Sequence, residues 1–173
     1  SVTLGPVAGT GSGHGLVIDG TVLGSGVYAK VDGNGIIVGG LGNSVGIAGG
    51  ITVNGQVQAS SNGASATGIR IGAAATVPEI RNAGVIDVLG KTATGIAVDV
   101  SGTLPAVRNS GTIRATASAT TGSATAIIDR SGTLVLVENS GAILATGAAA
   151  DSARNVAIDL TANGTGATVR QTA

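Results

Sequence analysis

The chain has 173 residues, no Cys, Met, Phe or Trp, one aromatic residue (Tyr28), and nine basic residues that balance nine acidic ones. Without cysteine there is no disulfide, no thiolate zinc site and no cysteine nucleophile. The scattered, balanced charges argue against a nucleic-acid surface, and the apolar runs are too short to span a bilayer.

The first 48 residues match the rest of the chain only loosely. The segment GLVIDGTVLGSGVYAKVDGNG shows the same order of elements as later segments, with Asp19 in the place that they give to asparagine. The Gly-rich segment 36–50 looks like an extra strand or an insertion. We therefore expect residues 1–48 to form irregular coils or a cap, and residues 49–173 to form the regular repeats of one continuous domain.

The regular part repeats one phrase. VRNSGTIRAT at 107–116 returns as VENSGAILAT at 137–146, and more loosely as IRNAGVIDVL at 80–89. An asparagine anchors each copy at intervals of 28, 27 and 30 residues, and a glycine and then an aliphatic residue follow it. The anchors are Asn54, Asn82, Asn109 and Asn139, and the aliphatic residues are Val57, Ile86, Ile113 and Ile143.

A repeat of this length, built from short alternating segments, predicts a β-solenoid. Sustained helical spacing is absent, no Leu recurs at fixed positions, and a propeller blade needs about four strands in roughly 40–45 residues. The predicted fold is all-β, a parallel β-helix with 27–30 residues in each coil. Each coil is expected to contain about three strands of about two to five residues.

Coils of a parallel β-helix stack about 4.7–4.9 Å apart, so equivalent side chains touch. The four aliphatic residues that follow the anchors are therefore expected to form one inward core ladder. The four asparagines are expected to form a turn ladder at a sharp bend. Asn tolerates the left-handed backbone conformation, and its amide can hydrogen-bond the amide of the next coil.

Outward charges are expected to pair between neighbouring coils. Glu138 aligns between Arg108 and Arg170, and Asp87 aligns with Arg114. Opposite charges on adjacent strands contribute about 0.2–1 kcal/mol each. These pairs are therefore expected to specify register rather than to form a site.

Two segments, 116–124 and 146–155, differ in length and carry no repeat pattern. They are predicted to be loops that leave one edge of the solenoid between the second and third strands. Insertions in repeat proteins gather on one face, which is often the binding face.

Asp99, Asp129 and Asp159 recur at intervals of 30 residues. A carboxylate ladder on a β-solenoid could bind Ca²⁺ or act on a sugar chain. Turn residues that accept hydrogen bonds from nearby backbone N–H groups are the favoured alternative, because no His, Tyr or second acid accompanies them. The sequence leaves open whether this ladder binds a cation. The lone His14 is expected at a surface or capping position.

The phrases VRNSGTIRATA…AIIDRSGT and VENSGAILATG…VAIDLTANGT resemble the passenger regions of bacterial autotransporters and related large surface proteins. In that family NSGTI-type repeats build a right-handed parallel β-helix. The resemblance covers Gly49 to Ala173 and implies this handedness and an extracellular, cell-surface location. The family's C-terminal translocator barrel is not in this sequence, so we expect a fragment of a longer chain or a subunit whose end a neighbour covers.

Three functions remain as expectations. The first is a non-enzymatic, structural or adhesive stalk of a Gram-negative surface protein, with loops that contact a host or cell-surface ligand. The second is a filament subunit that self-associates through open solenoid ends. The third is a polysaccharide-cleaving enzyme with Asp129 and Asp159 as its catalytic pair. Under the first function we expect no catalytic, cofactor-binding or metal-binding residue. Under none of the three functions do we expect a cofactor, a nucleic-acid partner or a membrane span.

Overall fold

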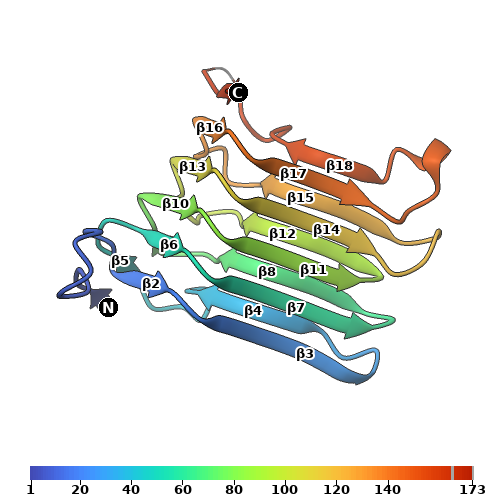
Figure 1. The fold of residues 1–173 in the computed structure, drawn as a ribbon, viewed down its shortest axis with the longest axis horizontal. Coiled ribbons are helices and arrows are strands. Elements are labelled where there is room, and N and C mark those ends of the chain that lie inside the picture. The colour runs from blue at the N-terminus through green and yellow to red at the C-terminus, as the bar shows by residue number, and fades with distance from the viewer. Residues whose placement is uncertain (165, 173) are drawn as a thin grey trace.

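The computed structural model describes residues 1–164 and 166–172. Parallel strands wind into stacked coils from the blue N-terminal end to the red C-terminal end (Figure 1), which confirms the predicted β-solenoid. Five coils each contribute one strand to three sheets, and β19 begins a sixth coil. Within the described residues the single helix is the 3-10 turn η1 (Ala150–Ser152).

Three sheets run along the solenoid, and we name them by their residues and length. The asparagine sheet contains β2 (Leu16–Ile18), β6 (Ile51–Val53), β10 (Glu79–Asn82), β13 (Ala106–Asn109), β16 (Leu136–Asn139) and β19 (Thr168–Gln171). The long sheet contains β3 (Thr21–Ala29), β7 (Gln56–Asn62), β11 (Val85–Gly90), β14 (Thr112–Ala117) and β17 (Ala142–Thr146). The threonine sheet contains β4 (Gly33–Val38), β8 (Ser65–Ile71), β12 (Thr92–Val98), β15 (Ser123–Asp129) and β18 (Asn155–Asp159).

Residues 1–48 are more regular than expected. Strands β2, β3 and β4 pair in parallel with β6, β7 and β8, so residues 16–38 already form a coil of the solenoid. The expected extra strand is β5 (Val45–Ile47), which lies between β1 (Val2–Leu4) and β9 (Ala75–Thr76) in a short fourth sheet. The loose sequence match arose because β3 extends to nine residues and contains a register shift between Gly26 and Ala29.

The aliphatic core ladder lies in the long sheet. Ile86 pairs with Val57 on one side and with Ile113 on the other, and Ile113 pairs with Ile143. The side chains of Val57, Ile86 and Ile113 are fully buried, and Ile143 in the last complete coil is half-buried. Burial of one such side chain contributes about 1.5–3 kcal/mol, so this column is a main source of stability.

The strands of the asparagine sheet have the two to five residues expected, whereas eight strands of the long and threonine sheets are longer. Three strands of the threonine sheet have seven residues, and β14 has six. Alternation of buried and outward residues continues through small residues, as in TIRATA of β14, where Ala115 and Ala117 face the core. The loop predicted at 116–124 therefore begins two residues too early, because β14 continues to Ala117.

Glycine after the asparagine lets consecutive coils approach closely. A Cβ on Gly84, Gly111 or Gly141 would lie 2.0 Å from a backbone oxygen of the coil before it. No side chain fits there without a shift of the backbone, which explains the glycine in every copy of the phrase.

Candidate functional site

Three of the four predicted anchor asparagines form a continuous ladder. Asn82 Nδ2 donates to Asn109 Oδ1 at 2.6 Å, and Asn109 Nδ2 donates to Asn139 Oδ1 at 2.6 Å. Asn139 Nδ2 in turn donates to Gln171 Oε1 at 2.7 Å. These three asparagines are buried, and each also donates to the carbonyl of the glycine two positions later. The ladder therefore pairs the side-chain amides at the bend between the asparagine and long sheets, with the exception of Asn82 Oδ1, which has no partner among the described residues.

Asn54 does not belong to this ladder, so its prediction is wrong by one residue. The residue paired with Asn82 is Val53, and Asn54 is exposed and donates to Asp19 Oδ1 at 2.8 Å. The anchors also do not adopt the left-handed conformation. Among described residues other than glycine, positive φ occurs at Lys30, Ala74, Ser101 and Ala153. The asparagines instead end their strands with ladder hydrogen bonds.

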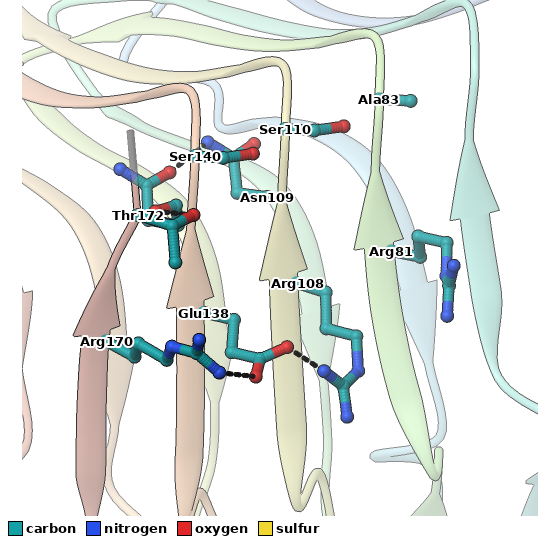
Figure 2. Close-up of a pocket in the computed structure, with 10 residues that line it drawn as sticks. Arg81, Ala83, Arg108, Asn109, Ser110, Glu138, Ser140, Arg170 and Thr172 are labelled. Carbon is teal, nitrogen blue, oxygen red and sulfur yellow. Dashed lines mark hydrogen bonds and ion pairs between the residues drawn. The ribbon is translucent and has the colours of Figure 1, made fainter.

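A row of charged side chains follows the outer face of the asparagine sheet (Figure 2). Glu138 on β16 lies between Arg108 on β13 and Arg170 on β19, as the sequence alignment predicts, and it pairs with both. Arg108 also donates to Glu79 Oε2 at 3.1 Å. Glu138 and the three arginines Arg81, Arg108 and Arg170 line a groove of about 400 Å³. Because these charges pair with one another across neighbouring strands, they help to fix the register of the strands.

His14 links the N-terminal segment to this row of charged side chains. Its Nε2 lies 2.9 Å from Glu79 Oε1, and the side chain is buried. Burial raises the pKa of Glu79, but the hydrogen bond with His14, the charge of Arg81 and the hydrogen bond from Arg108 together lower it below its ordinary value. The histidine is therefore a structural contact near the end of the solenoid, in agreement with the capping expectation.

The three aspartates do not stack. Asp129 occupies the inward position of Val98, and Asp159 pairs with Ile128, which is an outward position. Asp99 accepts from Arg70 Nε at 2.5 Å and from Arg130 Nη1 at 3.3 Å. The predicted ladder is therefore wrong: paired residues of β12, β15 and β18 are 31 positions apart, whereas the aspartates are 30 apart, so each aspartate falls one position earlier in its strand than the one before.

Asp129 and Asp159 play the turn role that the sequence favoured. Asp129 is buried and accepts from Ser131 Oγ at 2.6 Å, from Ser131 N at 2.8 Å and from Leu134 N at 2.8 Å. Burial raises the pKa of Asp129, and these hydrogen bonds more than offset it, so the pKa lies below its ordinary value. Asp159 accepts from the backbone and hydroxyl of Thr161. The catalytic pair of the third hypothesis thus lacks a shared site.

The two predicted loops leave the same edge, between the long and threonine sheets. They cover residues 118–122 and 147–154, the second with η1 (Figure 1). Arg154 Nη1 donates to the carbonyl of Thr121 at 3.1 Å, and Ala149 N donates to that of Thr120 at 3.0 Å. The loops thus stack on one another as the strands do.

A second groove, missed by the sequence reasoning, lies on the outer face of the threonine sheet. Its floor is formed by Thr67 and Thr94, which pair in register on β8 and β12. The signal was the recurring triplet S/T-A-T, at Ser65–Thr67, Thr92–Thr94 and Ser123–Thr125. This triplet was overlooked because hydroxyl residues are common throughout the chain. The groove has a volume of about 360 Å³ and is lined mainly by polar side chains.

No protein-family model, curated protein or solved structure matches this chain. Among the residues that the structure describes, no three His, Asp or Glu side chains converge on a possible metal position. No helix in residues 1–164 and 166–172 has the length and apolar character needed to cross a bilayer.

Proposed function

We propose that this chain is a rigid, non-enzymatic stalk segment of a Gram-negative, autotransporter-like surface protein. The single observation that carries the proposal is the unbroken parallel pairing of six strands, from β2 to β19, along one sheet. A solenoid of this kind resists bending, because each coil hydrogen-bonds the next along its length. The NSGTI-type phrases support the surface assignment by resemblance.

Stiffness is tested by a distance between two coils. Ser25 and Thr146 are exposed residues of one column of the long sheet, four strand spacings or about 19 Å apart. The chain has no native cysteine, so the double variant Ser25→Cys, Thr146→Cys takes spin labels at these positions alone. Pulsed electron spin resonance is expected to give one narrow distance distribution; a broad one would contradict a rigid stalk.

Location is tested on intact cells of the source bacterium. Antibodies raised against the purified chain are expected to label unpermeabilised cells. Labelling that appears only after permeabilisation would rule out a surface role and leave the solenoid fold unaffected. A loop variant that lacks residues 118–121 should be labelled equally, since the stalk does not depend on this loop.

Self-assembly into a filament is a second candidate, favoured by one outward column of the long sheet. It reads Leu23, Gln58, Asp87, Arg114 and Leu144, so leucine occupies the two outermost coils and polar residues the three between them. Both leucines are exposed. A second copy with its β3 in register on β17 would place its Leu23 over Leu144 and its Val22 over Ile143 of the core ladder, and its β2 would replace β19 beside β16.

Sedimentation and electron microscopy at high protein concentration test this candidate. If copies stack, Leu144→Asp should abolish assembly, because it places a charge in the joined column. The matched control is Leu89→Asp, since Leu89 is an exposed outward leucine in the middle of the same sheet. Monodisperse native protein would dismiss the filament and leave the stalk proposal standing.

A further inference from the structure

We propose that the groove on the threonine sheet binds a neutral oligosaccharide that lies along the solenoid axis. This inference is independent of the proposed surface role. It starts from a corner in the strands of this sheet, where Gly95 and Ile96 are consecutive buried residues of β12. A Cβ on Gly95 would lie 2.4 Å from the backbone oxygen of Ala126, so the corner requires glycine.

The corner hollows the outer face of the sheet. Thr67 and Thr94 form the floor of the hollow, and Ser65 and Thr92 lie beside them, two residues earlier on the same strands. Strand spacings of about 4.8 Å and residue spacings of about 6.6 Å along each strand arrange these four hydroxyls as a regular array. The groove continues onto β4 at Asn34, which pairs with Thr67.

The hydroxyl of Thr94 is open to the groove and is available to a ligand. Thr94 has 8% of its surface exposed and lines the groove, yet its Oγ1 makes no hydrogen bond with any described residue. The Thr94 oxygen does not belong to the fully buried, unpaired side-chain atoms of the described residues, so a ligand in the groove can reach it. A hydroxyl both donates and accepts, so its best partners in such a groove are other hydroxyls or water.

The opposite wall supplies fixed donors and acceptors. Asp99 holds Arg70 and Arg130 in place through two ion pairs. Together with Asp32 these groups are two acidic and two basic residues, so the lining carries no net charge. A polyanion gains nothing from such a surface, since electrostatic binding needs excess charge of one sign.

The shape and chemistry of the groove exclude an extended peptide. Peptides bind at free strand edges or in apolar grooves, whereas β8 and β12 are inner strands paired on both sides. Its volume of about 360 Å³ is that of a small ligand pocket. A hydroxyl-rich chain about two strand spacings long, or about 10 Å, matches Asn34, Thr67 and Thr94 together.

No aromatic ring is available for sugar stacking, because the single aromatic residue, Tyr28, lies on β3 of another sheet. Hydrogen bonds alone give modest net free energy. We therefore expect weak binding, with a Kd on the order of 1 mM, and a strong dependence on each floor hydroxyl.

The test is a titration of the labelled chain with four neutral tetrasaccharides, those of glucose (α- and β-linked), mannose and N-acetylglucosamine, followed through the threonine methyl signals by nuclear magnetic resonance. At least one sugar is expected to shift the signals of Thr67 and Thr94 in a saturable way. Thr94→Val should weaken that binding about fivefold or more, because valine keeps the shape and removes the hydroxyl.

Two matched variants complete the test. Thr94→Ser keeps a hydroxyl and should retain affinity within about twofold. Thr116→Val removes a hydroxyl from the outer face of β14, on another sheet, and should leave binding unchanged. The proposal is overturned if no tetrasaccharide shifts these signals, if the shifts map to another sheet, if the polyol sorbitol gives the same saturable shifts, or if Thr94→Val binds as the native chain does.

Discussion

Asn82 and Asn109 lie in consecutive coils with Nδ2 of Asn82 2.6 Å from Oδ1 of Asn109, and both side chains are buried. The contact fixes the register between neighbouring coils, because a slip of one residue would leave both side-chain amides without a partner. Asn109 is the central member, since it accepts from Asn82 and donates to Asn139.

Removal of the central amide should destabilise the solenoid. Asn109→Ala unpairs Asn139 Oδ1 and removes the acceptor of Asn82, so we expect the free energy of unfolding to fall by about 2–4 kcal/mol. Chemical denaturation followed by circular dichroism measures this change. The adjacent exposed Ser110 provides the control, because Ser110→Ala should change stability by less than about 0.5 kcal/mol. Equal effects of the two substitutions would show that the ladder contributes nothing.

The close approach of the coils at the bend gives a second prediction. Gly111→Ala places a Cβ 2.0 Å from the oxygen of Gly84, so the backbone must shift across two coils. We expect a loss of about 3 kcal/mol or more in the free energy of unfolding. Gly20→Ala is the control, because a Cβ on Gly20 meets no atom within 4 Å. A native melting temperature for Gly111→Ala would mean that the coils are further apart than the structure places them.

Much of the architecture could be predicted because stacked coils require side chains of similar size at equivalent inward positions. Val57, Ile86 and Ile113 recur in sequence because each sits over the last, and the pairing of Glu138 with Arg170 follows from the same register. The inward places allow only aliphatic residues of similar volume, so this pattern survives in the sequence.

Residue type alone did not predict which side of the strand a polar residue occupies. Asn54 resembles the other anchors but lies one position beyond them, on the outside, where Asp19 is its neighbour. Asp129 falls at an inward place that Val98 fills in the coil before it. A change of one residue in a coil reverses the side, so an alignment by identity misplaces such residues. The groove on the threonine sheet was missed because it depends on the corner at Gly95, and the sequence at this corner repeats only partly from one strand to the next.

The first loop should be dispensable. Ala117 pairs with Gly90 and Ser123 with Thr92, so the previous coil makes the same crossing with Lys91 alone. Deletion of residues 118–121 leaves Gly122 in the place of Lys91, and we expect the free energy of unfolding to change by less than about 1 kcal/mol. The control deletes the same number of residues, 114–117, from β14 and should abolish cooperative unfolding. Loss of the solenoid signal in the first deletion would contradict the loop assignment.

The buried Asp129 gives a prediction that depends on pH. Its carboxylate accepts from Ser131 and from Leu134 N, which an asparagine amide cannot match, because its Nδ2 would face a second donor. Asp129→Asn should therefore lower the free energy of unfolding by about 2–3 kcal/mol at pH 7. The folded-state pKa is lowered, so this carboxylate stabilises the fold above its unfolded pKa of about 3.9, and that stabilisation is lost as the pH falls through the lower folded value. The difference in the free energy of unfolding between the native chain and the variant, measured from denaturation curves, should narrow as the pH falls below about 4.

Asp151→Asn, on the exposed turn η1, is the matched control and should leave stability unchanged across that range. A gap that stays constant down to pH 2 would show that the charge of Asp129 does not stabilise the turn.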